Sequence, residues 1–236
     1  YKFGPNLLQA IQMLSDGTGY TVGVNRTILK TTNFGDTWIP LSFQSDLAPA
    51  SYFRLSNLHF FNRDRGLVIG DEGLIISTTD GGKTWTKINT GNSYNLNGIY
   101  CVSDSTWFVC GNFGTLLKTT DAGKNWETIS FTDIDQFQHL QKITFINAST
   151  GFLITWQYGL KTTDGGNTWT KMPGAGGGAL RGILFLDAQR GFIVGENGGA
   201  TLLQTTNGGD LWELNTASSN SSDVYSCIKT DPAKST

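Results

Sequence analysis

The chain has 236 residues, of which only 15% are charged, and its formal net charge at neutral pH is −2. A protein that neutralises phosphates needs a basic surface, so this balance argues against nucleic acid as a partner. No apolar run approaches the roughly 18 residues that a membrane-spanning helix needs, which argues against insertion into a membrane.

Glycine is unusually frequent in this chain. Its 30 glycines are almost twice the usual share of about 7%. Such a composition is typical of many short strands joined by tight turns, and helix is not expected. Because an all-β barrel or sandwich of this length commonly forms one domain, we expect a single all-β domain.

The predicted strands come in groups of four, in the same order each time. The first strand is an apolar alternation, at residues 7–14, 55–61, 96–102, 140–146 and 180–186. The second is a short apolar run, at residues 19–23, 66–70, 107–111, 151–155 and 191–195. The third lies at residues 27–32, 74–79, 115–120, 159–163 and 201–206, and the fourth begins at a tryptophan. Four short strands per unit is the make-up of a β-propeller blade.

One eight-residue motif joins the third strand to the fourth in every group. Its copies are TTNFGDTW (31–38), TTDGGKTW (78–85), TTDAGKNW (119–126), TTDGGNTW (162–169) and TTNGGDLW (205–212). Its final residues are Trp38, Trp85, Trp126, Trp169 and Trp212, which follow one another at intervals of 47, 41, 43 and 43 residues. A period of about 40 to 45 residues is typical of propeller blades.

The chemistry of the motif indicates a structural turn. Its third residue is Asn33, Asp80, Asp121, Asp164 or Asn207. A metal ligand or a general base would tolerate asparagine badly, whereas either side chain can accept hydrogen bonds from backbone N–H groups a residue or two ahead. The fifth residue is glycine in all five copies, as a requirement for positive φ would demand. We interpret the following tryptophan as a large apolar anchor between neighbouring blades.

These motifs resemble the Asp-box, or BNR, repeat of sialidases, sortilin-type receptors and related propellers. The form Thr-Thr-Asp-Gly-Gly-x-Thr-Trp, preceded by Gly-Phe-x-Val-Gly, is most similar to the photosystem II stability/assembly factor family and its bacterial relatives. The resemblance covers essentially the whole chain and implies a β-propeller. Those relatives are typically exported, so it also implies an extracytoplasmic location, whether secreted, periplasmic or lumenal.

We expect one propeller domain with five complete blades. The predicted blades are at about 1–43, 44–90, 91–131, 132–173 and 174–216. Residues 217–236 contain DVYSCIKTD, which aligns with NGIYCVSD of the third unit, so they begin a sixth repeat or add a closing strand. The resemblance favours a parent with more than five blades, whereas five repeats that each start at a first strand keep closure at five open.

The two ends of a blade are expected to differ in role. The Asp-boxes lie at the same end as the loops between first and second strands. The other end carries more variable loops, together with long segments between blades such as residues 44–52 and 132–139, and is the expected binding face. Its candidate residues are Arg26, Glu72, Phe113, Trp156, Tyr158 and Glu196. Trp156 and Tyr158 could stack on a sugar ring or anchor a protein, or Trp156 could merely cover a blade edge.

The first strands also supply a set of residues that alternates with the buried set. These residues are Gln12, His59, Tyr100, Thr144 and Leu184, and we expect them to line a central channel. Cys101 and Cys110 sit in consecutive predicted strands, where they could form a disulfide or remain small buried thiols.

No pattern of catalytic or metal-binding residues is recognised. Three cysteines without metal-ligand spacing and two histidines predict neither a metal site nor a cofactor. Sialidases clamp a carboxylate with three arginines, whereas only Arg181 of the six arginines here is expected near a first strand. A glycosidase would need two facing carboxylates, and although Glu72 and Glu196 share the candidate face, nothing distinguishes them from solvated loop acids.

The sequence therefore predicts a non-enzymatic propeller that acts as a binding or assembly scaffold for a protein partner. A carbohydrate-binding propeller is the alternative, and a sialidase-like glycosidase is a third hypothesis. The resemblance implies an arginine-rich patch that photosystem assembly propellers use to engage their partner. The arginines of this chain are sparse and dispersed, so the sequence departs from the family at that point.

Overall fold

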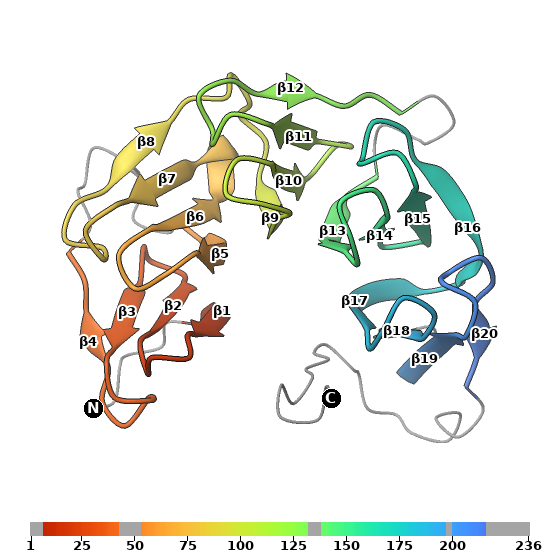
Figure 1. The fold of residues 1–236 in the computed structure, drawn as a ribbon, viewed down its shortest axis with the longest axis horizontal. Coiled ribbons are helices and arrows are strands. Elements are labelled where there is room, and N and C mark those ends of the chain that lie inside the picture. The colour runs from red at the N-terminus through yellow and green to blue at the C-terminus, as the bar shows by residue number, and fades with distance from the viewer. Residues whose placement is uncertain (1–6, 43–52, 132–137, 197–199, 216–236) are drawn as a thin grey trace. The chain divides into compact units, whose positions relative to one another are not determined.

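The computed structural model describes residues 7–42, 53–131, 138–196 and 200–215 (Figure 1). These residues form five four-stranded antiparallel sheets, each built from four strands that follow one another in the chain. The predicted all-β architecture of propeller blades is thereby confirmed. The expected sixth repeat or closing strand at 217–236 lies outside the described residues.

The first three sheets follow the predicted groups of strands. Sheet 1 contains β1 (Leu8–Met13), β2 (Gly19–Gly23), β3 (Ile28–Thr31) and β4 (Ile39–Pro40). Sheet 2 contains β5 (Leu55–Phe60), β6 (Gly66–Gly70), β7 (Ile75–Thr78) and β8 (Thr86–Ile88), with the short 3-10 helix η1 (Asp71–Gly73) between β6 and β7. Sheet 3 contains β9 (Leu96–Cys101), β10 (Trp107–Gly111), β11 (Leu116–Thr119) and β12 (Glu127–Thr128).

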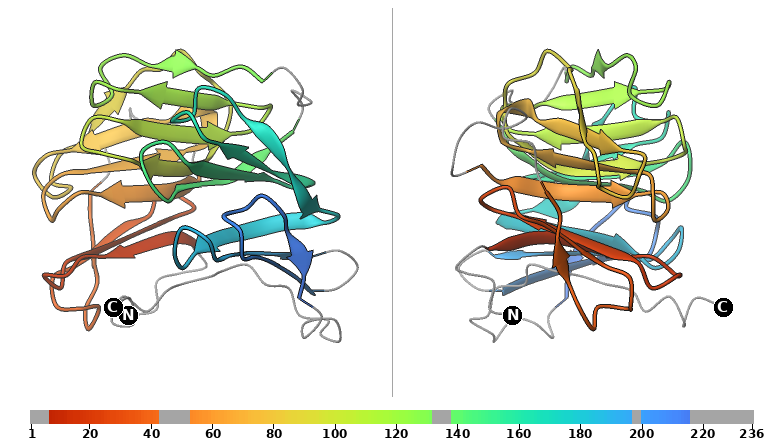
Figure 2. Two further views of the ribbon diagram at one scale, coloured as in Figure 1. Left: turned by 45° about the vertical axis from the view of Figure 1, so that its right-hand side comes forward. Right: turned by 90° about the vertical axis from the view of Figure 1, so that its left-hand side faces the viewer.

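The last two sheets have the same order of strands, and they are the teal and blue parts of the ribbon in Figure 2. Sheet 4 contains β13 (Leu140–Phe145), β14 (Gly151–Thr155), β15 (Tyr158–Thr162) and β16 (Thr170–Gly176). Sheet 5 contains β17 (Ala179–Phe185), β18 (Gly191–Glu196), β19 (Ala200–Thr205) and β20 (Glu213–Leu214). The chain forms two compact units: unit 1 is Tyr1–Val109 with Lys118–Glu127, and unit 2 is Cys110–Leu117 with Thr128–Thr236.

Burial changes systematically across each sheet. The second strands β2, β6, β10 and β14 are buried at every position. Both faces of such a strand are covered, which is why the sequence there is a continuous apolar run and not an alternation. The fourth strands β4, β12 and β20 are exposed at both of their positions. The core therefore lies around the second strands, and the fourth strands form the solvated edge.

A phenylalanine and a glycine face each other where the first strand turns into the second. Phe60 ends β5 and pairs with Gly66 of β6, and a Cβ on Gly66 would collide with the Phe60 ring. The same pairs are Phe145 with Gly151 and Phe185 with Gly191. Glycine at these positions is thus required by the ring that covers it. In sheet 3 the sizes are reversed, because Cys101 ends β9 and Trp107 begins β10.

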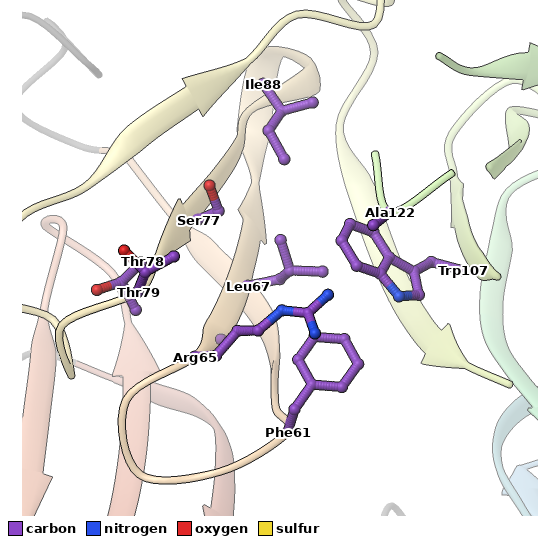
Figure 3. Close-up of a pocket in the computed structure, with 10 residues that line it drawn as sticks. Phe61, Arg65, Leu67, Ser77, Thr78, Thr79, Ile88, Trp107 and Ala122 are labelled. Atoms are coloured by element: carbon purple, nitrogen blue, oxygen red, sulfur yellow. The ribbon is translucent and has the colours of Figure 1, made fainter. Parts of the chain in front are cut away.

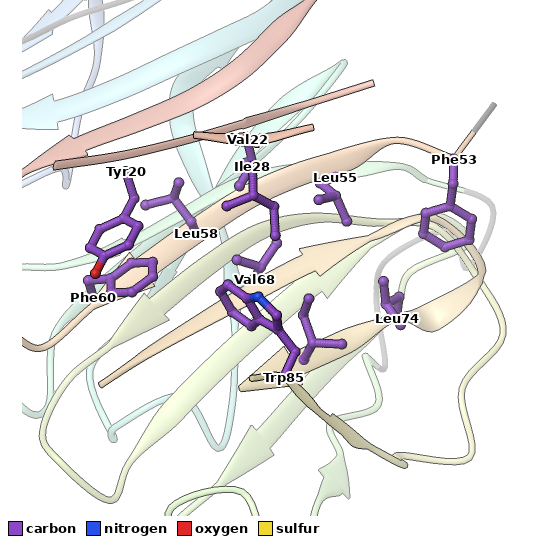
Figure 4. Close-up of a cluster of buried hydrophobic side chains, with 11 residues drawn as sticks. Tyr20, Val22, Ile28, Phe53, Leu55, Leu58, Phe60, Val68, Leu74 and Trp85 are labelled. Carbon is purple, nitrogen blue, oxygen red and sulfur yellow. The ribbon is translucent and has the colours of Figure 1, made fainter. Parts of the chain in front are cut away.

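Stacked aromatic rings hold sheet 1 against sheet 2 within unit 1 (Figure 4). The rings of Tyr20 and Phe60 are nearly parallel, with centroids 3.5 Å apart. Trp85 meets Phe60 edge-on at 6.4 Å, and the Lys30 Nζ lies 5.2 Å from the centre of the Tyr20 ring. Full burial of each large apolar side chain contributes about 1.5–3 kcal/mol, so this junction is a main source of stability.

The same arrangement recurs between sheets 4 and 5 within unit 2. Phe152 stacks on Phe185 with ring centres 4.1 Å apart, and the Lys161 Nζ lies 5.7 Å from the Phe152 ring centre. Trp212 meets Phe185 edge-on at 5.8 Å, and its Nε1 lies 3.3 Å from the Met172 sulfur of the preceding sheet. The Asp-box tryptophan therefore contacts both its own sheet and the sheet before it.

The structure gives the extent of strand β16 and the state of Cys101 and Cys110. The predicted boundary between the fourth and fifth blades falls between residues 173 and 174, but β16 continues through Gly176. Gly174 has φ +75° and packs so closely on the backbone of Trp212 that a Cβ would collide with the carbonyl oxygen. Cys101 and Cys110 carry thiols and form no disulfide.

Candidate functional site

The Asp-box turn between β7 and β8 is closed by two side chains. The Thr78 hydroxyl donates a hydrogen bond to Asp80 Oδ1 at 2.9 Å and accepts one from the Gly82 N–H at 2.9 Å. The Thr84 N–H donates to Asp80 Oδ1 at 2.9 Å, and the Thr84 hydroxyl donates to Asp80 Oδ2 at 2.6 Å. Both carboxylate oxygens are therefore engaged in holding the turn.

These bonds reach further along the chain than the sequence predicted. The backbone donor lies four residues after Asp80 and not one or two, because the turn is wider than a simple Asx turn. Asn33 and Asn207 accept the equivalent bond, from the N–H groups of Thr37 (3.0 Å) and Leu211 (3.1 Å). A neutral amide thus makes the same closing contact as a carboxylate, which is what the interpretation as a turn requires.

The first threonine of the motif has a structural role that the motif's chemistry did not predict. The residues in question are Thr31, Thr78, Thr119, Thr162 and Thr205, and all five are buried. Each hydroxyl accepts a hydrogen bond from the N–H of the motif's fifth residue, the glycine found in all five copies, at 2.9 to 3.1 Å. The presence of threonine in all five copies was the signal that could have revealed this role.

The turn contacts also set the acidity of the Asp-box carboxyl groups. Hydrogen bonds from the hydroxyl and the N–H of Thr84 lower the pKa of Asp80 to about 2. The same contacts from Thr168 lower the pKa of Asp164 to about 2, and the N–H and side chain of Asn125 do so for Asp121. A general base works best with a pKa near the operating pH, so these carboxylates are suited to structure and not to proton transfer.

Backbone hydrogen bonds tie each Asp-box to the loop between the first and second strands of its sheet. The N–H of Gly81 donates to Asp64 O at 2.8 Å, and the N–H of Gly165 donates to Ser149 O at 2.8 Å. Within each sheet these two loops thus lie at one end, here named the Asp-box end. The loop between the second and third strands lies at the other end of the sheet, here named the opposite end.

Three aromatic side chains meet at the opposite end within unit 2. The ring of His139 lies 5.4 Å from the ring of Phe113 and 5.3 Å from the ring of Trp156, measured between centroids. Phe113 is 47% exposed and Trp156 is 46% exposed. We name Phe113, His139 and Trp156 the aromatic row. Exposed aromatic side chains that touch one another are typical of surfaces that bind a partner.

The backbone and two amide side chains hold the aromatic row in place. The Gly114 N–H donates to Gln138 O at 2.7 Å, which links the loop of Phe113 to the segment of His139. Gln138 Nε2 donates to Gln157 Oε1 at 3.1 Å, which links that segment to the loop of Trp156. The Leu180 N–H donates to Trp156 O at 3.3 Å. The row is therefore positioned by hydrogen bonds that join four separate segments.

Phe113 adopts a backbone conformation that bulky residues avoid. Its φ is +53° and that of Gly114 is +65°. Two successive positive φ values are typical of a type I′ turn, which favours asparagine or glycine at both positions. The left-handed conformation costs an ordinary side chain about 1–2 kcal/mol. An exposed phenylalanine retained at that cost motivates the hypothesis that its ring has a binding role.

The other predicted binding residues lie at the opposite ends of their own sheets. Tyr158 begins β15, and Lys171 Nζ lies 4.6 Å from its ring centre. The Arg26 N–H donates to Phe53 O at 3.0 Å, and the Glu72 N–H donates to Asn95 Oδ1 at 3.0 Å. His139 was not singled out from the sequence, although residues 132–139 were assigned to this face as a long segment between blades.

The predicted channel residues share one degree of exposure. Gln12, His59, Tyr100, Thr144 and Leu184 are all half-buried. Gln12 has a further role, because its side-chain amide donates to Phe60 O at 2.9 Å and accepts from the Phe60 N–H at 2.7 Å. His59 lies against Phe61, with ring centres 4.8 Å apart, and burial lowers the pKa of His59.

One of the two carboxylates considered for glycosidase chemistry is held in an ion pair. Glu196 Oε1 pairs with Arg181 at 2.6 Å, whereas the Glu72 side chain is exposed. The expectation that only Arg181 lies near a first strand is incomplete, since Arg54 directly precedes β5 and pairs with Asp71 at 3.1 Å. Within the described ranges, no group of three His, Cys, Asp or Glu side chains is placed to hold a metal ion.

The part of the chain that the structure describes has no helix with the length and apolar character needed to cross a membrane.

Comparison with known proteins places these features in a family context. The family model described as Photosynthesis system II assembly factor YCF48 matches residues 5–94 and 57–133, more than half of the chain. Photosystem II stability/assembly factor HCF136, chloroplastic, of Oryza sativa subsp. japonica is 30% identical over 82 residues, which are 35% of this chain and 20% of that protein. Photosystem II assembly lipoprotein Ycf48 of Synechococcus sp. (strain CC9902) is 37% identical over 70 residues, which are 30% of this chain and 20% of that protein. The matched segments thus span about a fifth of the length of these relatives.

Solved structures show the same fold at low sequence identity. YCF48 bound to D1 peptide superposes with a TM-score of 0.60 at 16% identity and covers 93% of this chain and 88% of that chain. An ancestral GH74 enzyme superposes with a TM-score of 0.74 at 15% identity and covers 89% of this chain and 31% of that chain. Because assembly factors and enzymes both share the fold, the fold alone does not decide the function.

Proposed function

This chain belongs to the family described as Photosynthesis system II assembly factor YCF48, and we propose that it is a non-enzymatic scaffold that binds a protein partner through the opposite ends of its blades. The curated relatives are named as stability or assembly factors, and one related structure is YCF48 bound to D1 peptide. Assembly factors act by contact with other proteins, so this ancestry favours a protein ligand.

The aromatic row is the single observation that carries the proposal. Phe113 and Trp156 each expose nearly half of their surface, and a contiguous exposed aromatic surface of this kind is typical of binding hot spots. The Asp-box turns use their carboxylates internally. These carboxylates are therefore not available to a partner, whereas the touching rings of the aromatic row are partly exposed at the opposite end.

The proposal includes an extracytoplasmic location and no catalytic role. One relative is named chloroplastic and another is named a lipoprotein, which favours an exported protein. Glu196 Oε1 is engaged by Arg181 at 2.6 Å, so the ion pair gives this carboxylate a structural role. We expect no hydrolysis of xyloglucan or of sialosides above the background rate. Hydrolysis that disappears in Glu72→Gln or Glu196→Gln would contradict the non-enzymatic assignment.

A displayed peptide library and a glycan microarray test the proposal together. Peptides that the native protein enriches should not bind the Phe113→Asn, Trp156→Ala double variant. The matched control is Phe34→Asn, because Phe34 is also an exposed phenylalanine with positive φ but lies in an Asp-box. Peptide binding that survives the double variant and disappears in the control would contradict the proposal.

Carbohydrate binding is the second candidate function, favoured by the exposed Trp156 indole. Aromatic faces stack well on sugar rings, and the neighbouring amides of Gln138 and Gln157 are suited to hydroxyl groups. Suppose that the native protein binds glycans but enriches no peptides, and that Trp156→Ala no longer binds those glycans. The partner would then be assigned as a glycan and not a protein.

A further inference from the structure

A pocket of about 130 Å³ lies between sheets 2 and 3 in unit 1, apart from the aromatic row (Figure 3). Its apolar wall is formed by Phe61, Leu67, Ile88 and Trp107. Thr78, Thr79 and Ala122 of two Asp-boxes also line it, so the pocket lies at the Asp-box end. The pocket is therefore distinct from the surface that the proposed function uses.

The pocket exists because three space-filling residues of the repeat are replaced here. At the junction of sheets 1 and 2, Lys30 covers Tyr20, and Tyr20 stacks on Phe60. At the junction of sheets 4 and 5, the same positions hold Lys161, Phe152 and Phe185. At the junction of sheets 2 and 3, they hold Ser77, Leu67 and Cys101. All three replacements are smaller than the residues they replace, so volume is left unfilled.

Trp107 and Arg65 border the space that the smaller residues leave. Trp107 stands at the position where sheets 2, 4 and 5 have glycine. Its ring centre lies 6.4 Å from that of Trp126, as Phe60 lies 6.4 Å from Trp85 in sheet 2. The indole thus takes over the phenylalanine's contact with the Asp-box tryptophan, but it does not fill the pocket.

The Arg65 guanidinium is held at the pocket by rings and by one backbone oxygen. Its central carbon lies 4.5 Å from the ring centre of Phe61 and 5.8 Å from that of Trp107, and Figure 3 shows the side chain over the Phe61 ring. Nη2 donates to Asp104 O at 2.9 Å. The Asp104 carboxylate lies 3.8 Å from Nη1 and is 85% exposed, so it is a weak, solvated competitor. Most of the five guanidinium donors remain available to a ligand.

We infer that this pocket binds an apolar monocarboxylate, with the ring or branched alkyl group against Leu67, Ile88 and Trp107 and the carboxylate on Arg65. Three observations carry the inference. The volume is close to that of a cavity of about 150 Å³, which is known to hold a benzene ring. Arg65 is the one charged residue among the ten that line the pocket. A guanidinium that is already fixed by aromatic rings loses little freedom when it pairs with a carboxylate.

A titration of the full chain with phenylacetate tests the inference. Binding is measured by isothermal calorimetry and by the shift of the Trp107 indole N–H resonance. Native protein should bind phenylacetate at millimolar concentration and bind toluene, which lacks the carboxylate, about tenfold more weakly. Arg65→Gln should weaken phenylacetate binding by about tenfold. Arg63→Gln is the matched control, since Arg63 lies on the same loop, does not line the pocket and is well exposed.

A second variant closes the pocket and does not remove the charge. Leu67→Phe with Ser77→Lys restores the residue types of the other junctions, so it should abolish binding while the protein keeps its fold. Absence of phenylacetate binding to native protein, or equal binding to native protein and Arg65→Gln, would overturn the inference. Binding that persists unchanged in Leu67→Phe with Ser77→Lys would also overturn it.

The same assay distinguishes two sources of the ligand chemistry. Short peptides that end in leucine are tested in two forms, one with a free C-terminal carboxylate and one with a C-terminal amide. Tighter binding of the free-acid peptide than of phenylacetate would assign the pocket to the C-terminus of a polypeptide. Tighter binding of phenylacetate would assign it to a free small carboxylate, and either result supports the pocket as a carboxylate site.

Discussion

The two ends of the blades differ in how they use their polar and aromatic side chains. At the Asp-box end, the Thr78 hydroxyl and the Asp80 carboxylate are engaged within the turn. At the opposite end, Phe113 and Trp156 project nearly half of their surface to solvent, and Phe113 does so from a left-handed backbone conformation. The first end repeats one solution five times, whereas the second changes from sheet to sheet.

This difference separates what the fold needs from what a ligand needs. A turn that must close in every blade permits little variation at the positions that close it, so the first residue of the motif is threonine and the fifth is glycine in all five copies. A loop that only has to connect two strands can carry a residue that destabilises it locally, if that residue contributes to binding. Stability should therefore depend on the Asp-box turns, and binding of the proposed protein partner should depend on the opposite end.

Thr78→Val should give the largest loss of stability among these tests. The substitution keeps the shape but removes the acceptor for the buried Gly82 N–H. An unsatisfied buried donor costs about 1–3 kcal/mol in the free energy of unfolding. Chemical denaturation measures the change, and Thr79→Val at the exposed neighbouring position is the control. Equal losses in the two variants would mean that the hydroxyl of Thr78 is not what holds the turn.

Phe113→Asn should have an opposite and smaller effect on stability. Asparagine tolerates the left-handed conformation that Phe113 adopts, so the free energy of unfolding should rise by about 1 kcal/mol or less. Phe34→Asn at the Asp-box end, with φ +57°, should give a similar gain. Partner binding should fall in Phe113→Asn and should be unchanged in Phe34→Asn. A loss of stability in Phe113→Asn would show that the ring supports the fold.

Replacement of the Asp-box carboxylates by amides should matter least at neutral pH. Asp80→Asn, Asp121→Asn and Asp164→Asn copy the amides of Asn33 and Asn207, so the thermal midpoint at pH 7 should change little. In acid the variants should differ from the native protein. The folded pKa of about 2 lies below the unfolded value of about 3.9.

The sign of the acid effect follows from that difference in pKa. A carboxyl group whose pKa is lowered by folding stabilises the native state above its unfolded pKa, and this contribution is lost as the pH falls through the folded pKa. Native protein should therefore lose stability between about pH 4 and pH 2. The triple variant should lose less over that interval, as measured by thermal unfolding at each pH. Identical pH profiles would contradict the contacts assigned to the carboxylates.

The fold could be predicted well from the sequence because it depends on short motifs and apolar runs that recur in every blade. Five Asp-boxes and five groups of apolar runs gave five sheets with the expected strand order. It did not predict that β16 continues past Gly174, because close approach to the Trp212 carbonyl depends on the neighbouring sheet. It also placed the Asp80 hydrogen bonds too near in sequence, since the width of the turn depends on Thr78 beneath it.

The candidate site was predicted only in part. Phe113 and Trp156 stand out in loops whose residues differ among the repeats. The contact of both rings with His139 could not be predicted, because His139 comes from a segment without a repeat pattern. The pocket beside Arg65 could have been suspected from Leu67, Ser77 and Cys101, which break the repeat together. Recognising the gap required knowing that these three positions meet at one junction.

Hydrogen exchange of the protein with and without a bound partner peptide tests the central claim most directly. Binding at the opposite end should slow exchange at the N–H groups of Gly114, Gln157 and Tyr158, which lie beside the aromatic row. Exchange at the Asp-box amides of Thr84 and Thr168 should be unchanged. Protection of the Asp-box amides, with no change at Gly114, Gln157 and Tyr158, would contradict the account.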